Sequence, residues 1–482
     1  MQRAQGTGTG PLPAGEPWRW SAAETAAMVG GGRITATEVV LAHLARLDAT
    51  AALNAVTRRD DERALRRAAA VDAAVRDGAA PGPLTGVPVT IKDSVDVAGQ
   101  SSPNGVGALD GRIAAVDAPL VQHLHAAGAI VIGRTNAPEF SWRWHTDNPL
   151  FGATVNPWSP AHTPGGSSGG AAAALAAGVG AIAQGSDAGG SLRWPASCCG
   201  VSTIRPTQHR VPMHNTTSDG ERSPAIDLMA VAGPLARTVG DLALVLDVLA
   251  RPSWRDPAHV PVGFPPAPPA GHRRFGVPRL PLEVAPAVQA ALDEAAQRLA
   301  AAGWRPVEVA LPSVEEAAAL WAALLNSDFH VTVRDTFLEL GSPALRLMLH
   351  VLDEVAEPLD LRGYVATLAR RAALLRAWQR LLHDEVDVVL LPVCREPTWA
   401  AGDDAGSPQR LRELYRANDP LVAINLLGLP AAVQPVGVFD GLPIGVQLVA
   451  ARFAERTALA AAADLEASGP APLAALWARP TG

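Results

Sequence analysis

The chain has 482 residues, of which 48% are hydrophobic and 18% are charged, so it can bury a large core and lacks the composition of a disordered protein. Its formal net charge of -7 excludes an overall basic field that would attract nucleic acid or an anionic membrane. No unbroken apolar run approaches the roughly 20 residues of a membrane span, and the Gly-, Thr- and Pro-rich start lacks a signal-peptide core, so we expect a cytoplasmic protein.

The N-terminal segment 1–76 is predicted to be a helical arm. Ser21 precedes Glu24, and Thr35 precedes Glu38, with the three-residue spacing of a capping box. Apolar residues recur at helical intervals after the second of these boxes. The segment therefore predicts at least two capped helices ahead of the main domain.

Segment 77–250 is predicted to form the core of the fold. Apolar, β-branched runs indicate short strands, and helical patterns lie between them. The strands are expected at 88–91, 129–133 and 178–183, and helices at 119–128 and 166–178. This alternation predicts an α/β fold with a sheet covered by helices on both faces.

Segment 251–420 is predicted to be a Pro-rich and helical insertion that forms a cap over the site, because 251–286 is dense in proline. Its later elements are expected to be helices, at 285–302 and across 313–378. Segment 421–482 is predicted to complete the core. Its elements are expected to be two strands, at 424–438 and 442–449, and a helix at 455–466.

Lys92 is the only lysine, and the other 39 basic residues are arginines. A GC-rich genome would explain the arginines, but not why the one lysine lies in the apolar strand segment between Gly86 and Asp93. Arginine keeps its proton in proteins, whereas burial can bring the pKa of a lysine into the working range. Lys92 is therefore predicted to be a general base.

Two Gly/Ser clusters, 164–170 and 186–193, place Ser167 and Ser191 24 residues apart, with a helix expected between the two serines. The chain can return after that helix, so Ser167 and Ser191 can lie side by side. The first cluster also satisfies the Gly-x-Ser-x-Gly pattern of a nucleophile elbow, but the three prolines just before it exclude the strand that this motif needs. No histidine with an aspartate partner lies near either cluster, so a lysine base is the better prediction.

With these motifs the sequence resembles the amidase signature family. The matching segments are Gly-Gly-Ser-Ser-Gly-Gly at 165–170, Gly-Ser-Asp-Ala-Gly-Gly-Ser-Leu-Arg at 185–193, the lysine strand 86–93, the loop 135–140, and the C-terminal stretches 428–430 and 441–448. The resemblance implies the amidase-signature fold, with a large central mixed sheet. Ser186, Ala188 and the stretch 201–206 depart from the pattern that is usual in the family, which leaves the subfamily open.

The resemblance also implies roles for individual residues. Ser191 is expected to attack a carbonyl carbon, Ser167 to relay a proton after a cis peptide bond with Gly166, and Lys92 to accept that proton. The backbone N–H groups expected to form an oxyanion hole are those of Ala188, Gly189, Gly190 and Ser191. Residues expected to support the site are Ser168 and the pair Asp187 and Arg193, which would hold the nucleophile turn.

Aromatic residues near both motifs predict a pocket for an apolar or aryl substrate. They are Phe140, Trp142, Trp144 and Trp194. The expected function is the hydrolysis of amides, and of esters or carbamates, as in aryl acylamidases and urethanases of the family. Two alternatives are the glutaminase component of a tRNA-dependent amidotransferase and an inactive relative that only binds a ligand.

We expect no cofactor, metal or disulfide framework. Three cysteines cannot all pair, Cys198 and Cys199 are adjacent, and no HExxH or paired CxxC pattern occurs. The expected partners are a small-molecule substrate and water, with the protein acting as a monomer or homodimer.

Overall fold

A mixed sheet forms the centre of the protein in the computed structural model, which describes residues 12–218, 220–279 and 282–479. Residues 1–11, where the expected arm begins, lie outside the described residues. The sheet has eleven strands in the order β1-β3-β2-β4-β6-β5-β10-β11-β9-β7-β8. In chain order they are β1 (Val56–Arg58), β2 (Pro88–Lys92), β3 (Ile130–Thr135), β4 (Ile182–Asp187), β5 (Ser202–Arg205), β6 (Val231–Ala236), β7 (Arg274–Pro278), β8 (Arg305–Val309), β9 (Val388–Pro392), β10 (Ala431–Phe439) and β11 (Leu442–Ala450).

Both faces of this sheet are apolar, as β9 illustrates. Val388 and Leu390 belong to one hydrophobic core, and Val389 and Leu391 belong to another. Side chains alternate between the two faces of a strand, so a strand that is apolar throughout needs cover on both sides. The prediction of an α/β fold with a mixed sheet covered on both faces is confirmed.

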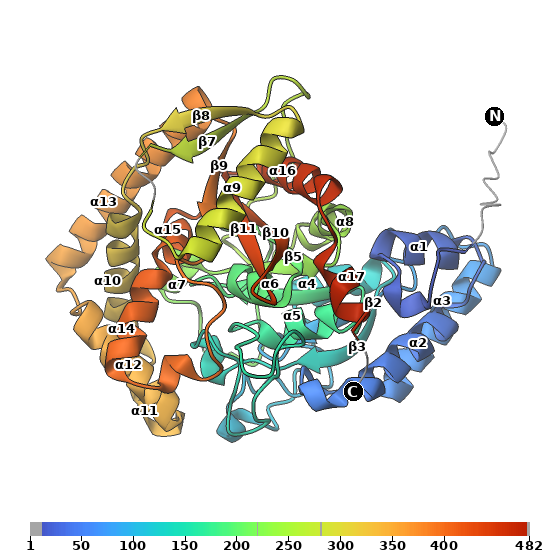
Figure 1. The fold of residues 1–482 in the computed structure, drawn as a ribbon. Helices are drawn as coiled ribbons and strands as arrows, with labels where there is room; N and C mark the ends of the chain where they lie inside the picture. Colours follow the sequence, from blue (N-terminus) through green and yellow to red (C-terminus); the bar gives the residue numbers. More distant parts are fainter. Residues whose placement is uncertain (1–11, 219, 280–281, 480–482) are drawn as a thin grey trace.

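Helices from distant parts of the chain provide that cover (Figure 1). One core packs against α4 (Pro119–Ala126), α8 (Val239–Leu249), α9 (Pro286–Ala301) and α16 (Glu455–Ser468). The other packs against α5 (Gly169–Ala176), α6 (Arg193–Cys199), α7 (Pro224–Met229), α15 (Asp419–Leu427) and α17 (Pro472–Trp477).

Two groups of helices lie at opposite ends of the molecule (Figure 1). The N-terminal group is α1 (Ala22–Gly30), α2 (Ala36–Ala49) and α3 (Asp61–Arg76), and both predicted capping boxes are formed at the starts of α1 and α2. The other group is α10 (Val314–Thr332), α11 (Arg334–Leu340), α12 (Pro343–Val355), α13 (Leu361–Arg380) and α14 (Pro408–Ala417). Within this second group, α10 packs against α15 and α7, and α13 packs against α15.

The structure differs from the sequence predictions in two places. Segment 251–420 contributes β7, β8 and β9 to the central sheet in addition to the helices of the second group, so it is more than an inserted cap. Residues 424–427, expected to begin a strand, end helix α15 instead, and Gly428 terminates that helix in a left-handed conformation (φ 65°). Every residue from Pro420 to Leu427 is buried, and a run that is apolar on all sides has no periodicity to separate helix from strand.

Within the described residues, no helix combines the length and the apolar character needed to cross a membrane.

Candidate active site

Two parallel strands bring the predicted base and the second serine cluster together. β2 pairs with β4 in the register that places Val89 opposite Ile182. Lys92 is the last residue of β2, and Ser186 is the second-last residue of β4. The carboxyl ends of neighbouring parallel strands meet at one edge of the sheet, which is where ligand sites of α/β folds form.

The amine of Lys92 is fully buried between two serine hydroxyls. Its Nζ lies 2.7 Å from Ser167 Oγ and 3.0 Å from Ser186 Oγ. Burial lowers the pKa of Lys92 to about 7, although the negative charges of Asp187 and Asp93 oppose this shift. A base whose pKa lies near neutrality is suited to general-base catalysis.

Ser186 is a member of the site that the sequence interpretation noted only as a departure from the family pattern. A small hydroxyl at the end of a strand parallel to the lysine strand is the feature that could have identified it.

Ser167 lies in a short loop after the cis peptide bond between Gly166 and Ser167, which the structure contains. The side chain of Thr146 holds both ends of this loop: its hydroxyl donates to Gly165 O at 2.8 Å and accepts the N–H of Gly169 at 3.1 Å. The loop that carries Ser167 is therefore held by Thr146, and the Ser167 hydroxyl itself is held by Lys92.

Ser168 connects the two Gly/Ser clusters. Its backbone N–H donates to Ser191 O at 3.3 Å, and its hydroxyl lies 3.3 Å from both the N and the O atom of Ser186. The first cluster is thus attached to the end of β4 and to the turn that carries Ser191. These contacts bring Lys92, Ser167 and Ser191 into one region, as the spacing of the motifs predicts.

Asp187 organises the turn that presents Ser191. Its carboxylate accepts the N–H of Gly190 at 2.8 Å and the N–H of Leu192 at 3.2 Å, and it pairs with Arg193 at 3.0 Å. Burial alone would raise the pKa of Asp187, but the charge and hydrogen bonds of Arg193 hold it well below its usual range. The predicted Asp187–Arg193 pair is present in the structure, and both side chains are fully buried.

Arg193 extends this network into the C-terminal part of the chain. Its guanidinium donates to Asn425 Oδ1 at 2.6 Å and to Gln447 Oε1 at 2.9 Å. Asn425 also donates to Asp187 Oδ1 at 2.7 Å. Asn425 and Gln447 were not singled out in the sequence, because an isolated amide in an apolar segment does not reveal what it contacts.

The turn 188–191 contains donors that are open to a ligand. The N–H of Gly190, which the sequence predicts to be an oxyanion-hole donor, is bonded to Asp187 at 2.8 Å. Gly190 adopts a φ of +97°, a conformation that glycine tolerates best. Within the described residues, the N–H groups of Ala188, Gly189 and Ser191 have no protein acceptor.

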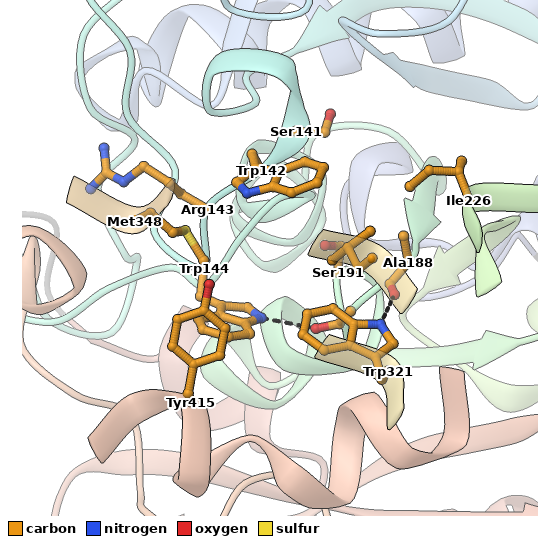
Figure 2. A pocket seen from close by; sticks show the side chains of 12 residues that line it. Ser141, Trp142, Arg143, Trp144, Ala188, Ser191, Ile226, Trp321, Met348 and Tyr415 are labelled. Carbon is orange, nitrogen blue, oxygen red and sulfur yellow. Dashed lines mark hydrogen bonds between the residues drawn. The ribbon is translucent and has the colours of Figure 1, made fainter. Parts of the chain in front are cut away.

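A pocket lined largely by aromatic and aliphatic side chains opens beside Ser191 (Figure 2). Ser191 is only 8% exposed, so its hydroxyl is sheltered but reaches the cavity. Four aromatic side chains form part of the wall: Trp142, Trp144, Trp321 and Tyr415. Aliphatic side chains and a thioether add to the wall: Ile226, Leu325 and Met348.

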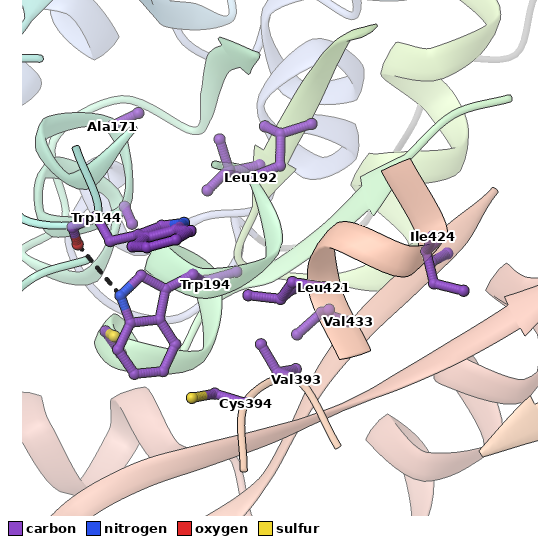
Figure 3. Close-up of a cluster of buried hydrophobic side chains, with 14 of the residues drawn as sticks. Trp144, Ala171, Leu192, Trp194, Val393, Cys394, Leu421, Ile424 and Val433 are labelled. Atoms are coloured by element: carbon purple, nitrogen blue, oxygen red, sulfur yellow. Dashed lines mark hydrogen bonds between the residues drawn. The ribbon is translucent and has the colours of Figure 1, made fainter. Parts of the chain in front are cut away.

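Of the four aromatic residues predicted to bind substrate, Trp142 and Trp144 line this cavity, whereas Phe140 and Trp194 are not among its lining residues. Phe140 stacks on Phe337 with ring centroids 3.9 Å apart. Trp194 is buried in the hydrophobic core, where its Nε1 donates to Trp144 O at 3.2 Å (Figure 3). This tryptophan lies in the first turn of helix α6, and the helix turns its side chain into the core.

The second group of helices supplies wall residues that the sequence interpretation did not identify. Trp321 and Leu325 come from α10, Met348 from α12 and Tyr415 from α14. Each lies in an ordinary helical pattern, where a side chain facing a cavity looks the same as one facing the core. Only the packing of these helices over Ser191 distinguishes them.

The whole chain is similar to known proteins. The family model described as Amidase matches residues 38–459. An indoleacetamide hydrolase of Bradyrhizobium diazoefficiens is 44% identical over 458 residues, covering 94% of this chain and 87% of the relative. A component of the glutamyl-tRNA(Gln) amidotransferase of Chloroflexus aggregans is 33% identical over 468 residues, covering 91% of this chain and 94% of the relative.

The solved structures agree at the level of the fold. The crystal structure of a bacterial aryl acylamidase, itself an amidase signature enzyme, superposes with a TM-score of 0.81 at 24% identity, covering 96% of this chain and 99% of that one. The family model, the relatives and the fold all lead to the same conclusion. The chain belongs to the amidase signature family of hydrolases.

Proposed function

We propose that this amidase hydrolyses a small amide with an aryl group, through an acyl-enzyme on Ser191 and a Ser191–Ser167–Lys92 triad. One observation carries the proposal. The fully buried amine of Lys92, with a pKa of about 7, lies 2.7 Å from the hydroxyl of Ser167. Ser191, on the neighbouring turn, lines an aromatic cavity. Burying an amine is costly, and it is retained where the neutral base has a use.

The first half of the proposed reaction forms the acyl-enzyme. Neutral Lys92 accepts the proton of Ser167 as Ser167 accepts that of Ser191, and Ser191 Oγ attacks the carbonyl carbon. The carbonyl oxygen becomes an oxyanion, which takes hydrogen bonds from the open N–H groups of Ala188 and Gly189. The intermediate collapses as the C–N bond breaks, and the leaving amine takes the proton back from the relay.

The second half regenerates the enzyme. Water gives a proton to the same relay and attacks the acyl carbon. The bond to Ser191 Oγ then breaks as the relay returns the proton to that oxygen, and a carboxylic acid leaves. The overall balance is one amide and one water converted to one acid and one amine or ammonia. An ester or an aryl carbamate presents the same carbonyl, and both substrate classes belong to the proposal.

The walls of the cavity favour an aryl substrate. The rings of Trp142, Trp144 and Trp321 surround the space next to Ser191, and aromatic faces bind flat apolar groups well. The relative that is 44% identical is named an indoleacetamide hydrolase, which makes indole-3-acetamide the first substrate to test.

A glutaminase role would need a cation in the cavity for the substrate's α-carboxylate. Among the described residues that line the cavity, Arg143 is the one cationic side chain. Its guanidinium is bonded to Asp147 and, at 2.7 Å, to Asp404, and it is only 2% exposed. The charge of Arg143 is therefore already neutralised, which disfavours glutamine as the substrate.

The test is a substrate panel assayed by release of ammonia, amine or alcohol. Indole-3-acetamide and an anilide should be hydrolysed with a higher kcat/KM than acetamide or glutamine, and Ser191→Ala should abolish the activity. Faster turnover of glutamine would favour the amidotransferase alternative. If Ser191 were not labelled by a serine-directed phosphonate and no substrate turned over, the inactive-relative alternative would hold.

A further inference from the structure

Two indole rings hold the turn 188–191 through its carbonyl oxygens (Figure 2). Trp321 Nε1 donates to Ala188 O at 2.9 Å, and Trp144 Nε1 donates to Gly189 O at 2.8 Å. We infer that Trp321 is a positioning residue that aims and strengthens the oxyanion-binding N–H of Gly189. This inference rests on the proposed function.

The geometry follows from the planar trans peptide. The carbonyl of one residue and the N–H of the next point in opposite directions from the same rigid plane, so fixing one end fixes the other. The peptide between Gly189 and Gly190 is held at both ends, by Trp144 and by Asp187. The peptide between Ala188 and Gly189 is held only at its carbonyl, by Trp321, and its N–H points away from the indole.

That free N–H is the donor that the reaction needs. Within the described residues the N–H of Gly189 has no acceptor, so it can bind a developing oxyanion. A hydrogen bond received by the carbonyl polarises the same peptide and makes its N–H a better donor, because chains of hydrogen bonds are cooperative. The bond from Trp321 therefore contributes both direction and strength.

Trp321 is placed for this role by close packing as well as by hydrogen bonding. A Cβ added to Gly189 would lie 2.9 Å from Trp321 Cζ2, so the ring rests directly on the glycine. The residue is 5% exposed, and a bond that is shielded from water is stronger than an exposed one. Trp321 comes from α10, so the helices over the site contribute to the oxyanion geometry.

The experiment compares Trp321→Phe, which keeps a ring but removes the donor, with the wild type. We expect kcat to fall about 10- to 100-fold, somewhat less than the roughly 10²- to 10³-fold loss on removing an oxyanion-hole donor outright. KM should change less than about threefold. The affinity for an arylmethyl trifluoromethyl ketone, which forms an oxyanion on Ser191, should fall by the same factor as kcat.

Trp477→Phe is the matched control. It removes an indole bond of the same kind, from Trp477 Nε1 to Ala176 O at 2.7 Å, at the end of α5 remote from the serine loop. It should leave kcat, KM and ketone affinity unchanged. Trp321→His, which retains a ring N–H, should recover part of the kcat that Trp321→Phe loses.

A Trp321→Phe variant with normal kcat and ketone affinity would overturn the inference. A rise in KM alone would also overturn it, because that result describes a binding wall and not a positioned oxyanion. If Trp321→Phe does not fold, Trp321→Leu supplies the same deletion of the donor. Ser191→Ala, assayed in parallel, tests the proposed function separately from the role of Trp321. Residual activity in Ser191→Ala would refute the proposed function. An inactive Ser191→Ala together with an unaffected Trp321→Phe would refute only the role of Trp321.

Discussion

Replacing Lys92 with arginine tests the base directly, because arginine keeps its proton at every working pH. With a pKa of about 7, half of the Lys92 amine is neutral at pH 7, about one tenth at pH 6 and about one hundredth at pH 5. At the ordinary value of 10.5, only about one amine in 3000 would be neutral at pH 7. Burial therefore increases the fraction of neutral Lys92 amine at pH 7 by about three orders of magnitude.

The assay is the pH profile of kcat/KM for a neutral amide between pH 5 and 9. We expect a tenfold rise per pH unit at low pH, a bend near pH 7 and a plateau above it, with Lys92→Arg inactive throughout. Since the chain has one lysine, ε-¹⁵N lysine labelling gives a single resonance that reports the same titration. Arg380→Lys is a control: side chain 380 is 81% exposed, and an added lysine there should leave the activity profile unchanged.

The same shift makes stability depend on pH. Between about pH 7 and 10.5 the unfolded chain holds a proton on Lys92 that the folded protein has lost, so the free energy of unfolding rises with pH across this window. Below pH 7 Lys92 is protonated in both the folded and the unfolded protein, so the free energy of unfolding carries the full cost of burying the charged amine. Lys92→Met should remove this rise while abolishing activity. A wild-type profile without a bend near pH 7, or an active Lys92→Arg variant, would refute the reasoning.

Three further predictions concern the surroundings of the base and the substrate. Ser186→Ala should move the acidic limb of the kcat/KM profile to lower pH by less than about one unit, because a hydrogen bond that favours the protonated amine is lost. Asp187→Asn should lower the free energy of unfolding by about 3–5 kcal/mol in denaturant titrations, since Arg193 is left buried without its partner. Trp142→Ala should lower kcat/KM by about 10- to 100-fold for aryl amides and much less for acetamide, measured on the same panel.

Each of these predictions has a contrasting outcome. Asp247→Asn breaks an exposed pair with Arg456 and should lower the free energy of unfolding by less than about 1 kcal/mol. Equal decreases in Asp187→Asn and Asp247→Asn would contradict the claim that burial makes the Asp187–Arg193 pair costly to break. An equal loss of activity toward acetamide and aryl amides in Trp142→Ala would show that Trp142 is not a specificity wall. If the acidic limb of the kcat/KM profile did not move in Ser186→Ala, the Ser186 hydroxyl would not influence the pKa of the Lys92 amine.

The sequence could predict those parts of the site that lie in local motifs. Lys92 was identifiable because no other lysine exists, and Ser167 and Ser191 because each lies in a Gly/Ser cluster. The α/β architecture followed from the alternation of apolar strands and helices. These features depend on residue type and short-range spacing, which a sequence displays directly.

The parts that sequence could not predict depend on long-range packing. Trp321 and Asn425 lie 130 and more residues beyond Ser191, in helices whose own patterns show only burial. The hydrogen bond from the N–H of Gly190 to Asp187, three residues away, was also not predicted, because the sequence does not reveal the geometry of this turn. The strand expected at 424–427 is a helix because uniform burial removes the periodicity that separates the two.

The network around Arg193 has a consequence for the order in which the protein becomes competent during synthesis. The guanidinium is satisfied by Asn425 and Gln447, which leave the ribosome more than 230 residues after it does. A nascent chain that already contains the lysine strand and both serine clusters still lacks the partners that hold the nucleophile turn. We therefore expect hydrolytic activity to appear only after the C-terminal strands have joined the sheet.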